Sequence, residues 1–416
     1  MVGLARPLPG KEVAMVDPAR IRVTGPLVAH RQGLWDALLA LGYRPLSSVN
    51  LLRLTAHLSR WLHERGLSLA EVTPERITAF CAARRRAGYT QFLTPRALAP
   101  ILRYLRQAGV VPPPPAPPEP TGLERLVHDY TEYLLHERAL TVLAARAYGD
   151  IARQFLGSRL SAAPPAALEL TASDVTSFVL AAASRYATGT TKYLVTALRA
   201  LLRYLYREGR LAADLTGAVP AVAGWRLRGL PTGLAADQVP RLLRSCDRRR
   251  PIGRRDHAVL LLLVRLGLRA GEVAGLGLDD IDWPAGEFLI RGKGRREDPL
   301  PLPADVGAAL AHYLRTSRPR TSARQVFLGA RAPHRALSSG AISMIARRAG
   351  AHAGLPATSA HRLRHTAATQ LLRGGASLDE IAQVLRHRSH DTTAIYAKVD
   401  HRALSAVTRA WPGATR

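Results

Sequence analysis

Hydrophobic residues recur at helical spacing along most of this chain of 416 residues. Runs with apolar side chains at positions i, i+3, i+4 and i+7 predict amphipathic helices that bury one face. Two short runs, Phe288–Arg291 and Asp298–Leu302, depart from that spacing and lie on either side of a glycine-containing basic segment. Such a pair predicts a β-hairpin. We therefore expect a mainly α-helical protein with one small antiparallel β-sheet in its C-terminal part.

A proline-rich segment, Val111–Pro120 (VPPPPAPPEP), interrupts the helical pattern. Consecutive prolines hold the backbone in an extended polyproline II path, which makes this segment a semi-rigid spacer. A ligand for a proline-binding domain is the alternative interpretation. A second aperiodic stretch contains Trp225-Arg226-Leu227-Arg228 and predicts an interdomain linker. The expected order is an N-terminal helical domain at 1–110, the spacer at 111–120, a helical domain at 121–216, the linker at 217–230, a C-terminal domain at 231–402 and a tail at 403–416.

The helical domains on either side of the spacer look like two copies of one unit. Val72–Phe80 parallels Leu170–Phe178, and Ile101–Leu105 parallels Leu201–Leu205. Each copy predicts about four helices, the last with arginine and tyrosine on its outer face and a glycine shortly after its end. The alternative is convergent amphipathic patterning, because periodic helices imitate one another.

Two helices are expected early in the C-terminal domain, one at Gly233–Ser245 and a buried one at His257–Leu268 that delivers Arg269.

Three short helices are expected near the C-terminus. The first begins near Ser359 and ends at Gly374-Gly375, since glycine commonly ends helices. Ser377 and Glu380 form the sequence pattern of a capping box and open the second helix. The third places Tyr396 on its second turn. These three helices therefore carry polar side chains that are not needed to form a hydrophobic core, and helices this close in the chain can bring those side chains together.

Those polar groups follow a fixed order. His361 and Arg364 are three residues apart and share a helix face, and Tyr396 follows His387 by nine residues. Upstream stands Leu268-Arg269-Ala270-Gly271-Glu272. Lys293 lies between Glu272 and His361 in the sequence and is flanked by two glycines. It is one of only four lysines among 59 basic residues. A lysine here supplies a titratable donor, which arginine cannot.

This ordered set resembles the signature of the tyrosine recombinases, the phage-integrase-like DNA strand-exchange enzymes. The resemblance implies helical core-binding (SAM-like) domains and an α-rich catalytic domain at 231–402, with residues 121–216 as the core-binding domain and 1–110 as its possible copy. It implies chemistry without metal, ATP or other cofactor. The implied roles are Arg269 and Arg364 as phosphate clamps, Lys293 as the acid that protonates the leaving 5′-oxygen, His361 as acid or base, His387 as a hydrogen-bond donor to the scissile phosphate, Tyr396 as the nucleophile that forms a 3′-phosphotyrosyl link, and Glu272 and His365 as supports.

One residue departs from the family's pattern. The second histidine is usually preceded by glycine, whereas here Arg386 precedes His387. The turn that ends the helix must therefore form without the residue best suited to a positive φ angle.

A formal net charge of +28 favours a polyanionic partner, and nucleic acid is the usual one. We expect double-stranded DNA with specific recombination sites, contacted in part by Arg103, Arg203, Arg226 and Arg228. The resemblance implies a homotetramer on DNA, joined through the tail, with accessory proteins as further candidate partners. A membrane-surface protein is the rival, but we find no long apolar run and no signal peptide. Two cysteines fit a reducing cytoplasm.

Two other functions use similar residues. A non-enzymatic helix-turn-helix protein would need groove and phosphate contacts, but not a tyrosine nine residues after a histidine. A type IB-like topoisomerase uses nearly the same catalytic groups, although duplicated DNA-binding halves and a tail favour assembly of several protomers. Among recombinases, the added N-terminal domain favours an integrase or transposase of a mobile element over a chromosome-dimer resolvase.

Overall fold

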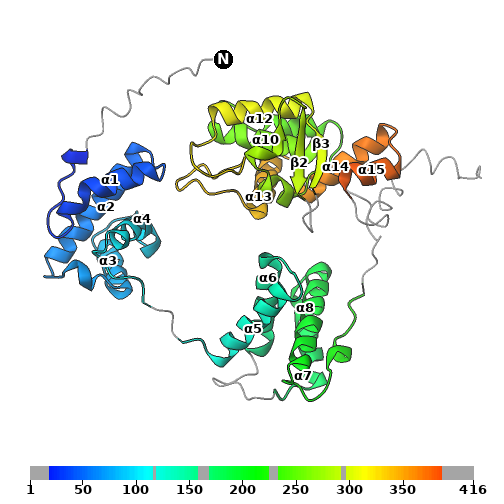
Figure 1. Ribbon diagram of the computed structural model, residues 1–416, viewed down its shortest axis with the longest axis horizontal. Coiled ribbons are helices and arrows are strands. Elements are labelled where there is room, and N and C mark those ends of the chain that lie inside the picture. The colour runs from blue at the N-terminus through cyan, green and yellow to red at the C-terminus, as the bar shows by residue number, and fades with distance from the viewer. Residues whose placement is uncertain (1–17, 116–118, 158–167, 224–232, 292–296, 387–416) are drawn as a thin grey trace, which may run out of the picture. The chain divides into compact units, whose positions relative to one another are not determined.

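The computed structural model describes residues 18–115, 119–157, 168–223, 233–291 and 297–386. The chain divides into two compact units, one formed by residues 115–228 and the other by the chain before and after them. Helices dominate both units, and the described strands form a single sheet in the C-terminal part, as the sequence predicts (Figure 1).

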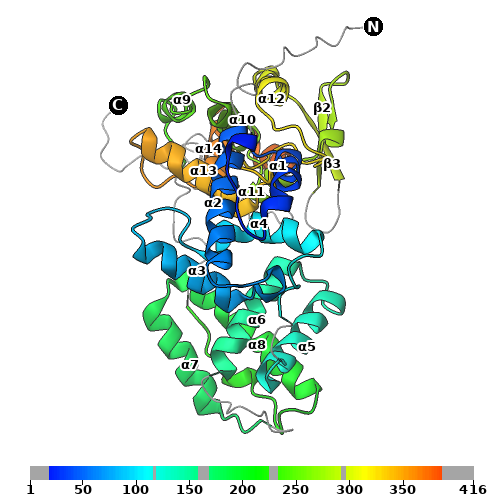
Figure 2. The same cartoon turned by 90° about the vertical axis from the view of Figure 1, so that its left-hand side faces the viewer.

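The N-terminal segment folds around its own hydrophobic core. Trp35, Leu52, Phe80 and Leu98 are among its buried residues, and the Trp61 and Phe80 rings meet edge to face at 5.7 Å. Its α-helices, drawn in blue and cyan in Figure 2, are α1 (Arg31–Ala40), α2 (Pro45–His63), α3 (Pro74–Arg86) and α4 (Pro95–Gln107), with 3₁₀ turns at Pro18–Arg20, Val28–His30 and Leu69–Glu71.

Residues 115–228 form a second four-helix unit with an aromatic centre. The Tyr130 ring lies 5.1 Å from that of Tyr204, and Tyr133 lies 5.0 Å from Tyr204. The prediction that the tyrosine of the last helix faces outward is wrong here, because Tyr204 is buried between these rings. The helices are α5 (Gly122–His136), α6 (Val142–Leu156), α7 (Ala172–Arg185) and α8 (Thr188–Arg207), followed by a 3₁₀ turn at Thr216–Ala218.

These two helical segments share a pattern of helix pairing. In each, the first helix packs on the second, and the second and third pack on the fourth. Thr73 and Thr171 each accept a backbone N–H at the start of the third helix. The fourth helix ends in each case before a glycine of positive φ, 71° at Gly109 and 66° at Gly209. The prediction of about four helices in each half is confirmed.

The C-terminal part is built around the buried helix α10, against which α12, α13 and α14 pack (Figure 1). The sequence predicts His257–Leu268 for this helix, but it begins at Pro251 and ends at Arg265. The expected helix at 233–245 is shorter, because α9 begins only at Gln238 and the Leu234 N–H donates instead to Thr366 Oγ1 at 2.8 Å. The elements are α9 (Gln238–Arg244), α10 (Pro251–Arg265), α11 (Ala270–Gly275), a 3₁₀ turn at Leu278–Asp280, β1 (Ile281–Asp282), β2 (Glu287–Arg291), β3 (Glu297–Pro301), α12 (Ala304–Thr316), α13 (Ser339–His352), α14 (Ala360–Arg373) and α15 (Leu378–Leu385).

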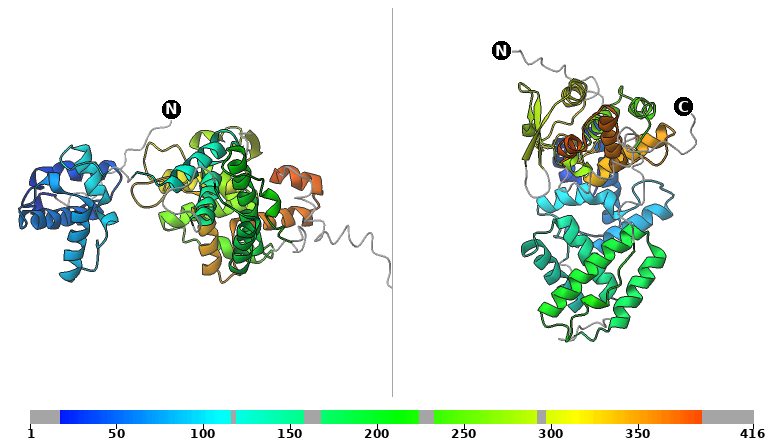
Figure 3. Two further views of the ribbon diagram at one scale, coloured as in Figure 1. Left: turned by 90° about the horizontal axis from the view of Figure 1, so that it is seen from below. Right: turned by 90° about the vertical axis from the view of Figure 1, so that its right-hand side faces the viewer.

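The sheet is a narrow antiparallel ribbon at one side of these helices (Figure 3). Its strands follow the order β1-β2-β3, with Phe288 opposite both Ile281 and Leu300. Phe288 and Ile290 point into the core, so the alternate residues of β2 anchor the hairpin. The predicted hairpin is confirmed, and β1 is an addition that the sequence analysis did not predict.

The ends of α14 and the start of α15 agree with their sequence signals. Ser359 Oγ accepts the N–H of Arg362 at 3.2 Å, and Gly375 has a φ of 96° after the last turn of α14. Ser377 and Glu380 form the predicted capping box, with bonds of 2.7 and 3.2 Å. The third expected helix, with Tyr396, lies outside the described residues, as does the tail. None of the described helices is both long and apolar enough to cross a bilayer.

Candidate catalytic site

A tight turn between α10 and α11 places Arg269. Gly267 has a φ of 59°, and a Cβ atom built on it would lie 2.5 Å from the side chain of Leu385. Only glycine fits this position, because both the backbone angle and the close approach of α15 exclude a side chain. Arg269 follows two residues later and stands immediately before α11.

Glu272, one turn into α11, is the anion that organises the site. Its side chain is 6% exposed, and its carboxylate accepts the backbone N–H of Arg269 at 2.8 Å and the Arg269 Nη1 at 2.7 Å. A third bond, of 2.6 Å, comes from Nη2 of Arg386. Burial raises the pKa of Glu272, but the Arg269 N–H, the charge of Arg386 and the Arg269 side chain together outweigh burial and hold that pKa below its usual value. Glu272 is therefore ionised at neutral pH.

Arg386 ends α15 in the left-handed conformation, with φ 53° and ψ 52°. Left-handed backbone costs a residue with a side chain about 1–2 kcal/mol. Here the side chain is 9% exposed and ion-paired with Glu272, while the carbonyl oxygen accepts from Nη2 of Arg269 at 3.2 Å. Arg386 thus makes, through backbone and side chain, two links between the end of α15 and the Arg269–Glu272 pair.

Arg364 on α14 is 4% exposed and joins three elements. Its Nη1 donates to the carbonyl oxygen of Gly267 at 2.6 Å, and its Nη2 donates to the carbonyl oxygen of Leu385. The guanidinium therefore spans the turn before Arg269 and the end of α15. Because these bonds fix its plane, its position is set before any substrate arrives.

Two histidines meet beside Arg364. His361 and His365 are one turn apart on α14, and their Nε2 atoms lie 2.9 Å from each other, so one ring donates and the other accepts. Burial, followed by the charges of Arg364 and Arg269, lowers the pKa of His361. Burial, His361 and Arg364 lower the pKa of His365 to about 4. The pair is consequently uncharged at neutral pH.

The remaining predicted residues divide into two groups. Arg103 on α4 and Arg203 on α8 are exposed, each on the last helix of its segment. Five others lie outside the described residues, although β2 and β3 run to either side of the segment that contains the lysine; these are Lys293, His387, Tyr396, Arg226 and Arg228.

The role of Arg386 as the partner of Glu272 was not predicted from the sequence, in which Arg386 stands out only as an unexpected residue in a turn that favours glycine. The useful signal was that mismatch itself, because a side chain kept at positive φ needs a compensating interaction.

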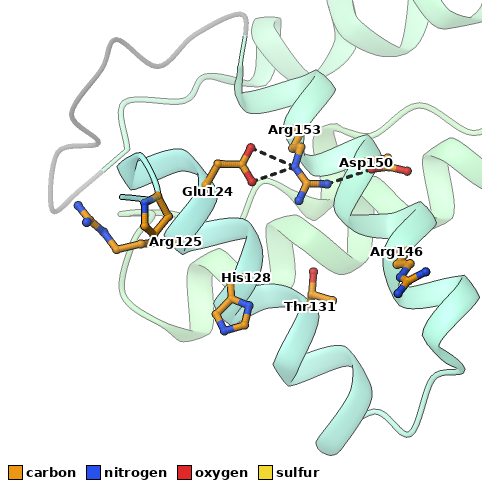
Figure 4. A pocket seen from close by; sticks show the side chains of 8 residues that line it. Glu124, Arg125, His128, Thr131, Arg146, Asp150 and Arg153 are labelled. Atoms are coloured by element: carbon orange, nitrogen blue, oxygen red, sulfur yellow. Dashed lines mark hydrogen bonds and ion pairs between the residues drawn. The ribbon is translucent and has the colours of Figure 1, made fainter. Parts of the chain in front are cut away.

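A recess of about 660 Å³ lies between α5 and α6, and none of the residues that line it is a predicted catalytic residue (Figure 4). Arg153 in its wall is already paired, donating to Glu124 at 3.1 Å and to Asp150 at 2.9 Å. Nowhere in the described ranges do three or more His, Cys, Asp or Glu side chains gather as a metal site would require. The expectation that no cofactor is needed stays a prediction.

A helical protein with a β-hairpin, in which three arginines, a buried glutamate and two histidines converge from the start of α11, from α14 and from the end of α15, has the framework of a DNA strand-exchange enzyme. Residues 233–402 match the Phage integrase family. A protein of Sinorhizobium fredii named as an integrase/recombinase, y4rA, is 39% identical over 393 residues, which cover 94% of this chain and 95% of that protein. Tyrosine recombinase XerD of Listeria monocytogenes is 31% identical over 66% of this chain and 94% of its own length.

Solved structures share the fold at lower identity. XerH recombinase in a post-cleavage complex with its difH substrate covers 67% of this chain and 83% of its own, with 21% identity and a TM-score of 0.52. A lambda integrase dimer bound to a COC′ core site covers 70% and 98%, with 17% identity and a TM-score of 0.51. The chain belongs to the tyrosine recombinase family of DNA-breaking and DNA-rejoining enzymes. This family assignment excludes the non-enzymatic helix-turn-helix reading.

Proposed function

We propose that this recombinase cuts and rejoins DNA at specific sites through a covalent link between Tyr396 and a 3′-phosphate. The observation that supports this most is that Arg269 and Arg364 both lie near His361, with the buried Glu272 holding Arg269 in place. Negative charge grows on the phosphate oxygens during the displacement, and fixed cations stabilise it. Because carbonyl groups, Glu272 and Arg386 already orient both guanidinium groups, little reorganisation is needed when DNA binds.

The proposed cleavage exchanges one phosphoester for another. The phenol oxygen of Tyr396 attacks phosphorus, the bond from phosphorus to the 5′-oxygen breaks, and Lys293 gives that oxygen a proton. Neutral His361, with its lowered pKa, is ready to accept the phenol proton. His387 donates a hydrogen bond to the phosphate. The ester energy stays in the phosphotyrosine, so attack by a 5′-hydroxyl reverses the step without ATP or metal.

We assign the enzyme to a mobile element, as an integrase or transposase. Listeria XerD matches over nearly its whole length yet covers only 66% of this chain, whereas y4rA covers 94%. The additional length therefore belongs to the integrase-like relative and not to a XerD-type protein. This comparison favours a mobile-element role over chromosome-dimer resolution and over solitary relaxation by a topoisomerase.

The partners in this proposal are duplex DNA with specific sites and three further copies of the chain, in the cytoplasm. A lambda integrase tetramer bound to a Holliday junction shares the fold, with a TM-score of 0.51, 16% identity and coverage of 79% of this chain. Residues 1–110 would act as an added DNA-binding module. Their helix pairing repeats that of α5–α8, and Arg103 is exposed where its counterpart Arg203 is exposed.

A nicked suicide substrate tests the chemistry. Wild-type protein should form a DNA-linked band on denaturing gels in excess EDTA, because the cations are side chains. Tyr396→Phe should bind the same DNA and form no such band. A DNA-linked band in Tyr396→Phe, or a wild-type band that forms only with Mg²⁺, would refute the proposal.

A further inference from the structure

Arg84, in the last turn of α3, is a buried cation whose hydrogen-bonding capacity is incompletely used. Its residue is 7% exposed, and two of its nitrogen atoms, Nε and Nη1, are buried without a hydrogen-bond partner. Nη2 donates to the carbonyl oxygen of Gln91 at 3.3 Å, and the guanidinium lies 4.0 Å from the centre of the Tyr89 ring. The described residues give Arg84 no carboxylate partner within ion-pair distance.

Arg84 is one of the residues that line a recess of about 260 Å³. Residues Tyr89–Phe92 close one side of it, and Phe92 turns that segment with a φ of 56°. The His57 ring meets the Tyr89 ring edge to face at 5.1 Å. The other side is formed by one face of α2, which contributes Asn50, Arg53, Leu54 and His57.

This lining contains two arginines and no acidic residue. The recess between α5 and α6 differs, because there Glu124 and Asp150 neutralise Arg153 (Figure 4). A buried charge without a counterion is unfavourable, and in the low dielectric of a protein it strongly attracts an anion. Asn50, Thr90 and Gln91 add hydrogen-bonding side chains at the rim, which a bare patch of positive charge would lack.

We propose that this recess in the N-terminal segment binds a phosphate group, and that in the working protein this group is a backbone phosphate of DNA. The second part rests on the proposed function, in which residues 1–110 contact DNA. Arginine pairs match the geometry of phosphate oxygens. The volume lies below the range typical of whole small-molecule ligands, so a single anionic group fits the recess better than an entire nucleotide.

His57 offers a built-in reporter of the anion. Burial, then the charges of Arg84 on α3 and Arg60 on its own helix, lower its pKa; Arg53 and the Tyr89 phenol are the other ionisable groups of the lining. A bound phosphate would offset those cations and raise the pKa again. The effect would be specific to the recess, because the phosphate must lie close to the imidazole.

The experiment uses the full chain with ¹³C-labelled histidine, and His57→Gln assigns the His57 signal. Titrating pH with and without inorganic phosphate should show the His57 pKa rising by at least half a unit in wild-type protein and staying unchanged in Arg84→Gln. If the Arg84 variant fails to fold, Arg53→Gln serves at the exposed rim of the same recess. The proposed site is refuted if phosphate leaves the His57 pKa unchanged. It is also refuted if the His57 pKa rises equally in wild type and both variants, which is the result that an adventitious ion only would give.

DNA binding separates this proposal from the proposed function. Arg84→Gln and Arg53→Gln should each lower affinity for a long duplex several-fold and flatten its log–log salt dependence by about one unit. The matched control, Arg86→Gln, changes an exposed arginine of α3 outside the recess and should change affinity less. If removing residues 1–118 weakens DNA binding while the recess variants bind as the control does, residues 1–110 contact DNA but the recess does not hold a DNA phosphate. If phosphate raises the His57 pKa but removing residues 1–118 leaves the DNA footprint unchanged, the recess binds an anion and DNA is not its ligand.

Discussion

Glu272→Gln should destabilise the catalytic framework more than any surface charge change. Glu272 and Arg386 have side chains 6% and 9% exposed, and removing the charge from Glu272 leaves Arg386 buried without a counterion. Loss of one partner of a buried pair costs about 3–5 kcal/mol. Arg386→Gly should cost less, roughly 2 kcal/mol, because Arg269 still pairs with Glu272 and glycine removes about 1–2 kcal/mol of left-handed strain.

Native-state hydrogen exchange measures this difference locally. Since each 1.4 kcal/mol corresponds to a factor of ten, amides of α11 and α15 should exchange about 100 to 4,000 times faster in Glu272→Gln. In Arg386→Gly the increase should be about 10- to 30-fold. Asp305→Asn is the control, because its ion pair with Arg265 is 43% and 52% exposed and should be worth less than about 1 kcal/mol.

The pH dependence gives a second readout of the same network. The folded-state pKa of Glu272 lies below the ordinary carboxyl value of 4.5. Its contribution to stability is therefore complete above that value and is lost as pH falls through the folded pKa. Glu272→Gln should lack this acid-side loss. Exchange rates in Glu272→Gln equal to those of Asp305→Asn would refute the argument.

Three further outcomes are expected. Lys293→Arg should bind DNA normally and cleave about 100 to 10,000 times more slowly, measured by single-turnover trapping, because guanidinium does not release a proton readily. His365→Phe should slow cleavage by about a hundredfold through a misplaced His361, while His365→Gln, which can still hydrogen-bond, retains more activity. Truncation after Arg402 should leave single-site binding intact and abolish paired-site complexes on native gels; equal pairing by the truncated chain would assign the tail to its own domain.

Local signals in the sequence predicted the local structure well. The Ser377–Glu380 capping box, the glycine end of α14 and the β2–β3 hairpin formed where short-range chemistry places them. Errors arose where distant contacts override helical pattern. Leu234 stays outside α9, with its N–H donated to Thr366, and Tyr204 turns inward because aromatic partners lie on α5.

The candidate site shows the same division. The ordered motif identified Arg269, Glu272, His361, Arg364 and His365, and the described fold brings all five together. No spacing rule connects position 272 with position 386, because that ion pair depends on how α15 packs beside α11. The orphaned nitrogen atoms of Arg84 likewise become visible only when burial is known.

The proposed mechanism requires Tyr396 to carry the DNA between cleavage and rejoining. Digestion of the trapped adduct, followed by tandem mass spectrometry, identifies the peptide and the residue that holds the nucleotide. We expect a 3′-phosphonucleotide on Tyr396 in the tryptic peptide that spans it. A nucleotide on any other side chain, or one attached through its 5′-phosphate, would exclude the proposed mechanism.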